Sequence, residues 1–211
     1  MVGLDQAEGF LIAAVVITLA PGPDNLMVVS LGAARGHRAG MAFGLGCACG
    51  CLSHTVLAAL GVSLLIAASP WAFGTLKLCG GGYLLWLGFK ALTASSGIAR
   101  GPAGTDDAST DRLAPLFRRG LLANAINPKV ILFFLAFLPQ FVVADRGAPG
   151  VQMAQLGLLF TAQAAVIFGV LGAGAGRIGD RLSRSPGFGL WLDRGAGAVL
   201  VGLGLKLIVL P

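Results

Sequence analysis

Proline interrupts two hydrophobic stretches of this chain, and these interruptions most restrict how it can fold. Residues 20–25 read Ala-Pro-Gly-Pro-Asp-Asn, and residues 124–129 read Asn-Ala-Ile-Asn-Pro-Lys. Proline removes a backbone donor and glycine loosens a helix, so each interruption leaves peptide groups without helical partners. Inside a bilayer such groups are tolerated only where protein buries them or where they line a cavity. The neighbouring Asp24 and Lys129 would make that cavity polar.

The composition is that of an integral membrane protein. Hydrophobic residues make up 56% of the 211 residues and charged residues only 11%. Glycine accounts for 33 residues, and glycine lets membrane helices pack closely. Six apolar stretches are long enough to cross a hydrocarbon core of about 30 Å. They lie at about residues 8–31, 39–68, 71–93, 117–142, 150–174 and 189–210. We therefore expect an all-α membrane protein of six transmembrane helices, in which residues 1–211 form a single membrane transport domain. Acidic residues, Asp5 and Glu8, precede the first stretch, so we interpret it as a retained helix and not as a signal peptide.

A polar connector at about residues 94–116 separates two groups of three stretches, repeat 1 at about 8–93 and repeat 2 at about 117–210. Each group begins with a proline-broken helix and ends with a helix in which two glycines lie seven residues apart. These glycines are Gly81 and Gly88 in the first group, and Gly197 and Gly204 in the second. Because three is odd, the second group must cross the membrane upside down. The sequence therefore predicts two inverted three-helix repeats with helices 1 and 4 broken at proline, as in transporters that bind substrate near the midplane.

Basic residues gather in the connectors on one side of these six stretches. They are Arg35, Arg38, Lys90, Arg100, Arg112, Arg118, Arg119, Arg177, Arg181, Arg184 and Arg194. The other side has only Arg146 and Lys206. Cytoplasmic loops carry the excess of Lys and Arg, so both termini are predicted to lie outside. The net charge of +6 comes from helix ends without an aromatic platform, which argues against a nucleic-acid partner.

At the first break, a helix that restarts at Pro23 would leave the N–H groups of Asp24, Asn25 and Leu26 unpaired. Their partial positive charge suits a carboxylate, either that of Asp24 or that of a bound substrate. Asp24 has two interpretations. It is a static partner of Lys129, or it is a carboxyl group that gains and loses a proton during transport.

At the second break, Pro128 frees the carbonyl of Asn124, Asn127 occupies the N-cap position and Lys129 follows in the first turn. Both the helix dipole and lipid disfavour a cation there, so we expect an anionic group to compensate it. One prolyl kink alone would fit a role in packing. Two kinks in corresponding stretches, each with amides and a charge, favour a polar transport site.

Three further polar side chains, His54, Tyr83 and Gln163, are predicted to lie at a similar depth and are candidates for hydrogen bonds to a substrate. His54 also fits a packing role. A soft-metal exporter is an alternative, because Cys47, Cys51 and His54 share one helix face. No intramembrane carboxylate or Cys-x-x-Cys joins that set, and cysteine in a glycine-rich helix is more often a packing residue.

A membrane thiol–disulfide oxidoreductase is a second alternative, although the second half of the chain has no cysteine to complete it. No phosphate-binding loop is found, so ATP is not expected to drive the protein. Four glycines spaced four, two and four residues apart on one helix favour close helix contacts, within a protomer or across a homodimer. They are Gly40, Gly44, Gly46 and Gly50.

The stretch at residues 127–141, together with the Pro-Gly-Pro of the first break and residues 36–40, resembles the LysE/RhtB family of amino-acid exporters. The resemblance runs from about Phe10 to the C-terminus. It implies a multi-pass protein of the bacterial inner membrane, a transporter and not an enzyme, that exports small amino acids or derivatives by proton antiport. The family's motif residues map onto Pro21, Gly22, Pro23, Asn127, Pro128 and Lys129. Members that export basic, neutral and sulfur-containing amino acids share these motifs, so the resemblance does not choose the substrate.

The sequence thus predicts a substrate-binding or coupling site between the broken helices. Its candidate residues are Pro21, Gly22, Pro23, Asp24, Asn25, His54, Tyr83, Asn124, Asn127, Pro128, Lys129 and Gln163. We expect neither a metal nor another cofactor. The expected partners are an amino-acid substrate, protons and the lipid bilayer, with a homodimer as one use of the glycine-rich helix face.

The predicted topology can be tested with a reporter that is active only in the cytoplasm. Fused near Thr105 the reporter should be active, and fused to the C-terminus it should be inactive, because the basic connectors are predicted to be cytoplasmic. A cytoplasmic C-terminus would contradict the six-helix inverted arrangement.

Overall fold

The computed structural model describes residues 1–62, 69–93, 112–184 and 186–209, and all regular secondary structure in these ranges is helical. The long helices are α1 Leu4–Leu19, α2 Pro23–Arg35, α3 His37–Val56, α5 Pro70–Leu92, α6 Leu113–Ala125, α8 Pro149–Arg184 and α9 Pro186–Val209. The short segments are η1 Leu57–Val62, α7 Pro128–Leu132, η2 Phe133–Phe137, η3 Leu138–Phe141 and η4 Ala144–Arg146. Most of the predicted connector, residues 94–111, lies outside the described residues. Its last part is already helical, because α6 begins at Leu113.

Proline breaks two helices where the sequence predicts it. The axes of α1 and α2 meet at 57°, and those of α6 and the segment after Pro128 meet at 50°. Each second helix begins at its proline, Pro23 or Pro128, because the missing N–H of proline costs nothing in the first turn. The prediction that helices 1 and 4 are broken is confirmed.

Two of the described helices are long and apolar enough to cross a membrane on their own, namely His37–Val62 and Pro149–Ile178. The number rises to four if each bent pair forms one span. The remaining long helices, α5 and α9, have 23 and 24 residues, which suffice for a core of about 30 Å. Within them, α5 has three consecutive glycines and α9 carries the charged residues Asp193, Arg194 and Lys206.

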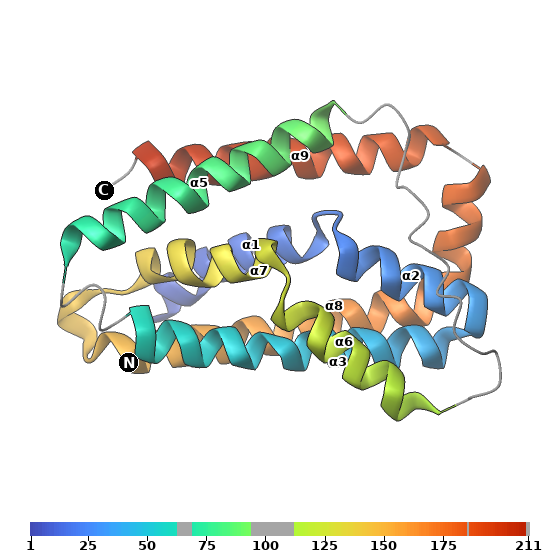
Figure 1. Ribbon diagram of the computed structural model, residues 1–211, viewed down its shortest axis with the longest axis horizontal. Coiled ribbons are helices and arrows are strands. Elements are labelled where there is room, and N and C mark those ends of the chain that lie inside the picture. Colours follow the sequence, from blue (N-terminus) through green and yellow to red (C-terminus); the bar gives the residue numbers. More distant parts are fainter. Residues whose placement is uncertain (63–68, 94–111, 185, 210–211) are drawn as a thin grey trace.

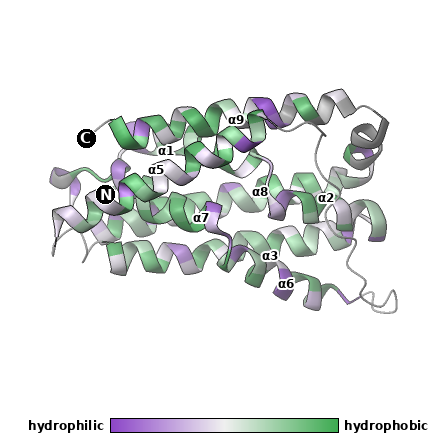
Figure 2. Cartoon of the chain, turned by 45° about the horizontal axis from the view of Figure 1, so that its top comes forward, coloured by the Kyte–Doolittle hydropathy of each residue, from purple (hydrophilic) through white to green (hydrophobic). Residues whose placement is uncertain are grey.

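The helices run roughly along one long axis (Figure 1), with α5 and α9 paired on one side and α3, α6 and α8 on the other. Helices α1 and α7 lie between these two groups. Both termini lie at the same end of the bundle, and the turn between α2 and α3 lies at the opposite end. Hydrophobic residues cover most of each helix, whereas hydrophilic residues concentrate at helix ends and at the start of α7 (Figure 2).

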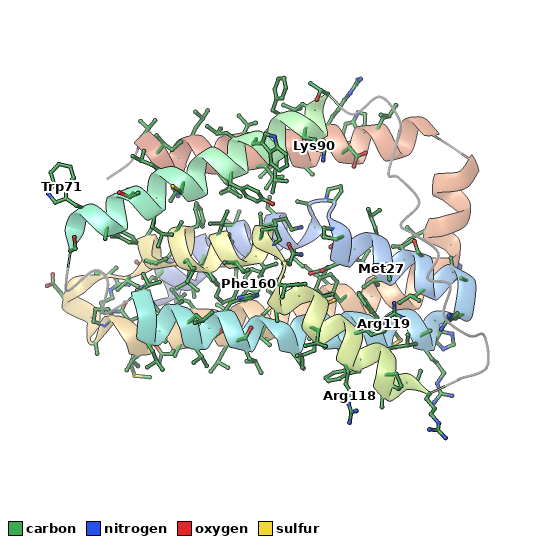
Figure 3. The ribbon with its side chains drawn as sticks, in the orientation of Figure 1. Met27, Trp71, Lys90, Arg118, Arg119 and Phe160 are labelled. Atoms are coloured by element: carbon green, nitrogen blue, oxygen red, sulfur yellow. The ribbon has the colours of Figure 1, made fainter. Side chains whose placement is uncertain are left out.

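Side chains at the bundle surface and in its interior differ as expected for a membrane protein. Phe160 points into the bundle, while Trp71 and Arg118 point away from it (Figure 3). Phe160 is 3% exposed and belongs to an aromatic cluster with Phe10, Phe133 and Phe134. Trp71 is 88% exposed near the start of α5, a position where tryptophan anchors helices at a membrane interface.

Glycine brings α3 into direct backbone contact with its neighbours. A Cβ atom on Gly46 would lie 2.0 Å from the carbonyl oxygen of Phe117, and one on Gly120 would lie 2.0 Å from that of Phe43. The other predicted glycines of α3 also lie close to neighbouring helices. A Cβ atom on Gly40, Gly44 or Gly50 would come within 2.8 Å of α2, α8 or α6, respectively. The glycine-rich face of α3 therefore makes close helix contacts within the protomer.

Glycine also joins α5 to α9 at two places. A Cβ atom on Gly88 would lie 2.7 Å from the carbonyl oxygen of Gly197, and the reverse distance is also 2.7 Å. Seven residues away on each helix, a Cβ atom on Gly204 would lie 2.9 Å from the carbonyl oxygen of Gly81. These are the four glycines that recur in the two halves of the sequence, and they set the antiparallel register of this helix pair.

Replacing Gly46 or Gly120 by alanine should destabilise the protein, because the added methyl group would collide with the backbone of the opposite helix. We expect a loss of about 1–3 kcal/mol in unfolding free energy, seen as a lower melting temperature of the purified protein in detergent. Gly169→Ala is the matched control, since a Cβ atom there meets nothing within 4 Å. Equal melting temperatures for all three variants would contradict backbone contact between α3 and α6.

Candidate functional site

The side chain of Asn25 compensates the first break. Its Nδ2 atom donates to the carbonyls of Thr18 (2.9 Å), Leu19 (3.3 Å) and Ala20 (3.4 Å), the last carbonyls of α1, which lack helical partners. The expectation that the Leu26 amide is free is wrong. It donates to the carbonyl of the N-cap residue Gly22 at 3.0 Å, because it is the fourth residue after that cap and closes the first helical bond.

The second break is capped as the sequence predicts. The Oδ1 atom of Asn127 accepts a hydrogen bond from the backbone N–H of Lys129 at 3.0 Å, which is the N-cap geometry. The carbonyl of Asn124, which Pro128 cannot pair, accepts from the backbone N–H of Asn127 at 2.9 Å. It also lies 3.0 Å from Nε2 of His54. Since a carbonyl only accepts, His54 carries its proton on Nε2 in this contact.

Lys129 is compensated by the end of a helix. Its side chain is 6% exposed, and its Nζ atom donates to the carbonyl oxygen of Ala20 at 2.8 Å. Ala20 is the C-cap of α1, where unpaired carbonyls and the helix dipole present negative charge. Among the described residues, no ion pair joins Lys129 to Asp24. The expected anionic compensation is thus supplied by backbone dipoles.

Asp24 is bound through an amide and not through a cation. Its side chain is 3% exposed, and its Oδ2 atom accepts from Nδ2 of Asn124 at 2.8 Å. The Oδ1 atom of the same Asn124 side chain accepts from Sγ of Cys51 at 3.4 Å. Asn124 therefore links three helices, with its amide between α2 and α3 and its carbonyl on His54.

The two charged residues bind in a reciprocal way. Asp24 and Lys129 are each the second residue of the helix that follows a break. Each reaches the end of the helix that precedes the other break, Asp24 to Asn124 of α6 and Lys129 to Ala20 after α1. Side chains of one break thus satisfy polar groups of the other, so the two breaks are held together.

A cavity of about 130 Å³ lies beside the breaks. One water molecule needs about 10–15 Å³ on this measure, so the cavity has room for a small molecule. The breaks and the pair α5–α9 both line it: Pro21, Gly22, Pro23, Asn127, Pro128, Lys129, Tyr83, Leu87, Ala91 and Leu200.

A second cavity of about 10 Å³, the size of one water, also borders Lys129. Its polar lining residues are Thr18, Asp24, Asn25, Cys51, Asn124 and Lys129. Lys129 lines both cavities, whereas Asp24 lines only the smaller one.

Nine of the predicted site residues therefore come together at the breaks, and Tyr83 joins them from α5. They are Pro21, Gly22, Pro23, Asp24, Asn25, Asn124, Asn127, Pro128 and Lys129. His54 and Gln163 line neither cavity. Nε2 of His54 instead contacts the carbonyl of Asn124. Nε2 of Gln163 donates to Oγ1 of Thr18 at 2.9 Å.

Sequence reasoning missed Thr18, Leu87, Ala91 and Leu200. A signal existed for two of them, because Leu87 and Ala91 follow Tyr83 at intervals of four and so share its helix face. No such pattern marks Thr18 or Leu200.

Several polar atoms around the site have no partner among the described residues. They are Oδ1 of Asn25, Nδ1 of His54, Nδ2 of Asn127 and Oε1 of Gln163. A buried polar atom without a hydrogen bond costs about 1–3 kcal/mol. Two of the four, on Asn25 and Asn127, lie at the breaks, which is typical of a place where water or a ligand completes the hydrogen bonding.

The cysteines form no site of their own. All four, Cys47, Cys49, Cys51 and Cys79, are free thiols, and within the described ranges no group of three His, Cys, Asp or Glu side chains could hold a metal ion. Cys51 instead bonds to Asn124 and to the carbonyl of Cys47. The two alternative functions therefore gain no support from this geometry.

Comparison with known proteins agrees with the resemblance seen in the sequence. An uncharacterised membrane protein of Pseudomonas aeruginosa is 32% identical over 206 residues, covering 97% of this chain and 95% of the relative. One of Vibrio cholerae is 34% identical over 199 residues, covering 94% of each. The leucine efflux protein of Klebsiella pneumoniae is 36% identical over 142 residues, covering 67% of this chain and 66% of the relative.

No solved structure matches the chain. The family model for the LysE type translocator matches residues 15–210, which include both breaks and every residue that lines the two cavities. The protein therefore belongs to the family of LysE-type translocators.

Proposed function

We propose that this LysE-type translocator exports amino acids across the bacterial inner membrane through the site at the two breaks. The observation that carries this proposal is Lys129, a buried cation on the wall of a cavity with room for a small molecule. An ammonium group has three donors, and one is used by Ala20. The others are available to a substrate carboxylate, together with the unpartnered Nδ2 atom of Asn127. The leucine efflux relatives support an amino acid as the cargo.

Two inverted three-helix repeats would place this site at the midplane. Three features support that architecture: the reciprocal binding of Asp24 and Lys129, the recurring glycines between α5 and α9, and the position of both termini at one end. Six spans require α5 and α9 to cross the bilayer, for which their lengths suffice. With the basic connectors in the cytoplasm, both termini lie outside.

Asp24 is our candidate for the proton-coupling group. It lines the smaller cavity, and Lys129 lines both cavities. Protonation would weaken its bond to the amide of Asn124, since a neutral carboxyl is a poorer acceptor. A substrate bound at Lys129 and a proton bound at Asp24 would then both act on the contacts that hold the two breaks together. A ligand shifts a conformational equilibrium only through different affinity for the two states, and the proposal requires this of both substrate and proton.

Lys129→Gln should abolish export while the protein still inserts. Glutamine preserves a donor for Ala20 but removes the charge that a substrate carboxylate needs. The measurement is loss of labelled leucine from proteoliposomes that contain the purified protein. Lys77→Gln, a substitution on α5 outside both cavity walls, is the control. Normal export by well-inserted Lys129→Gln would return Lys129 to a purely structural role.

Asp24→Asn should remove the response to a pH gradient while exchange of substrate continues. Asparagine keeps an oxygen acceptor for Asn124 but cannot release a proton at ordinary pH. Transport is compared in proteoliposomes with and without an imposed gradient.

A static pair of Asp24 with Lys129 gives a different outcome. The double swap Asp24→Lys with Lys129→Asp should then recover some transport. A coupling carboxyl held by local amides should not survive that swap. An unchanged gradient response in Asp24→Asn would show that the proton enters elsewhere.

A further inference from the structure

The larger cavity has polar and apolar walls in different places. Its polar groups, Asn127 and Lys129, belong to the second break. The opposite wall comes from α5 and α9 and consists of Leu87, Ala91 and Leu200, with Tyr83 as its one polar member. Among the described lining residues Lys129 is the only charged side chain, and none is a carboxylate.

We propose that this cavity selects amino acids with an uncharged aliphatic side chain and that Leu87 is a specificity-determining residue. This inference rests on the proposed function and adds to it a substrate class and an orientation. The carboxylate binds at Lys129 and Asn127, and the side chain lies against Leu87 and Leu200. The hydroxyl of Tyr83, which has no hydrogen bond among the described residues, is within the same wall and is available to the substrate's polar end.

Charge explains why other amino acids are rejected. The side chain of lysine or arginine would bring a further cation, in addition to Lys129 and the substrate's own α-ammonium group, into a cavity whose described lining has no carboxylate. A buried charge without a partner is strongly disfavoured. Glutamate would bring a second carboxylate, and the cavity has no further cation for it because Lys129 and Asn127 already bind the first. An aliphatic side chain leaves no polar group unpaired and removes apolar surface from water.

Position explains why Leu87 discriminates by size. Tyr83, Leu87 and Ala91 lie on one face of α5, and Leu87 is the middle of the three. The other leucine of the wall, Leu200, is 2% exposed and fixed in the bundle core, so its shape is set by packing. Leu87 is half-buried and can be shortened at less cost to the fold. One methylene in an apolar pocket changes discrimination by about 10- to 200-fold.

The test is exchange in proteoliposomes loaded with labelled leucine, with leucine, alanine, lysine or glutamate outside. For the unmodified protein we expect leucine to exchange at least about 100-fold better than lysine or glutamate. Equal exchange of leucine and lysine would overturn the proposed selectivity while export itself stands. Exchange of none of the four would instead contradict the proposed function.

Three substitutions test the role of Leu87. Leu87→Ala should lower the ratio of leucine to alanine exchange at least about tenfold, and Leu87→Val makes the same comparison with a smaller change in volume. Leu87→Asp supplies the missing carboxylate and should raise the ratio of lysine to leucine exchange. Leu78→Ala is the matched control, because Leu78 is 58% exposed on α5 and lies outside the cavity wall. Ratios for the Leu87 variants equal to those of Leu78→Ala would overturn this role.

Discussion

The hydrogen bond from the Lys129 ammonium to the Ala20 carbonyl is the contact on which the centre of this protein depends. Proline leaves carbonyls of α1 unpaired, and the second break places a cation where lipid and its own helix dipole disfavour it. Asn25 offsets only part of the first cost within its own half of the chain. Each is offset by the other, and Asp24 with Asn124 repeats the exchange in the opposite direction. The breaks must therefore stay together, and the cavities form where they meet.

Local chemistry explains what the sequence could predict. Proline fixes where a helix stops and restarts, so the starts of α2 and α7 and the N-cap role of Asn127 were predictable from a few residues. The partner of Lys129 was not, because a backbone carbonyl such as that of Ala20 has no mark in the sequence. The Leu26 amide was predicted to be unpaired because it was counted among the free N–H groups of the helix start. It is instead the first amide of α2 to form a helical hydrogen bond. Leu200 entered the cavity wall through packing of α9 on α5, which no local pattern specifies.

Close packing accounts for residues that would otherwise indicate a different chemistry. Cys47 and Cys51 are buried on α3 where glycines let α6 and α8 approach so closely that an added Cβ atom would collide. Only a small side chain fits there, and cysteine adds a weak donor that Asn124 accepts. His54 likewise serves the freed carbonyl of Asn124. Cys51 and His54 thus support the second break through Asn124, which accounts for their place on one face of α3 without a metal.

The opposite charges of Asp24 and Lys129 have an electrical consequence. A transmembrane potential acts on any net charge that moves, by about 2.3 kcal/mol per elementary charge for each 100 mV. With both residues ionised, the site has no net charge, and a zwitterionic amino acid adds none. Reorientation of such a site would be insensitive to membrane voltage, whether it is empty or loaded. Only a proton carried on Asp24 would make the movement electrogenic, so the membrane voltage would act on the protonated form alone.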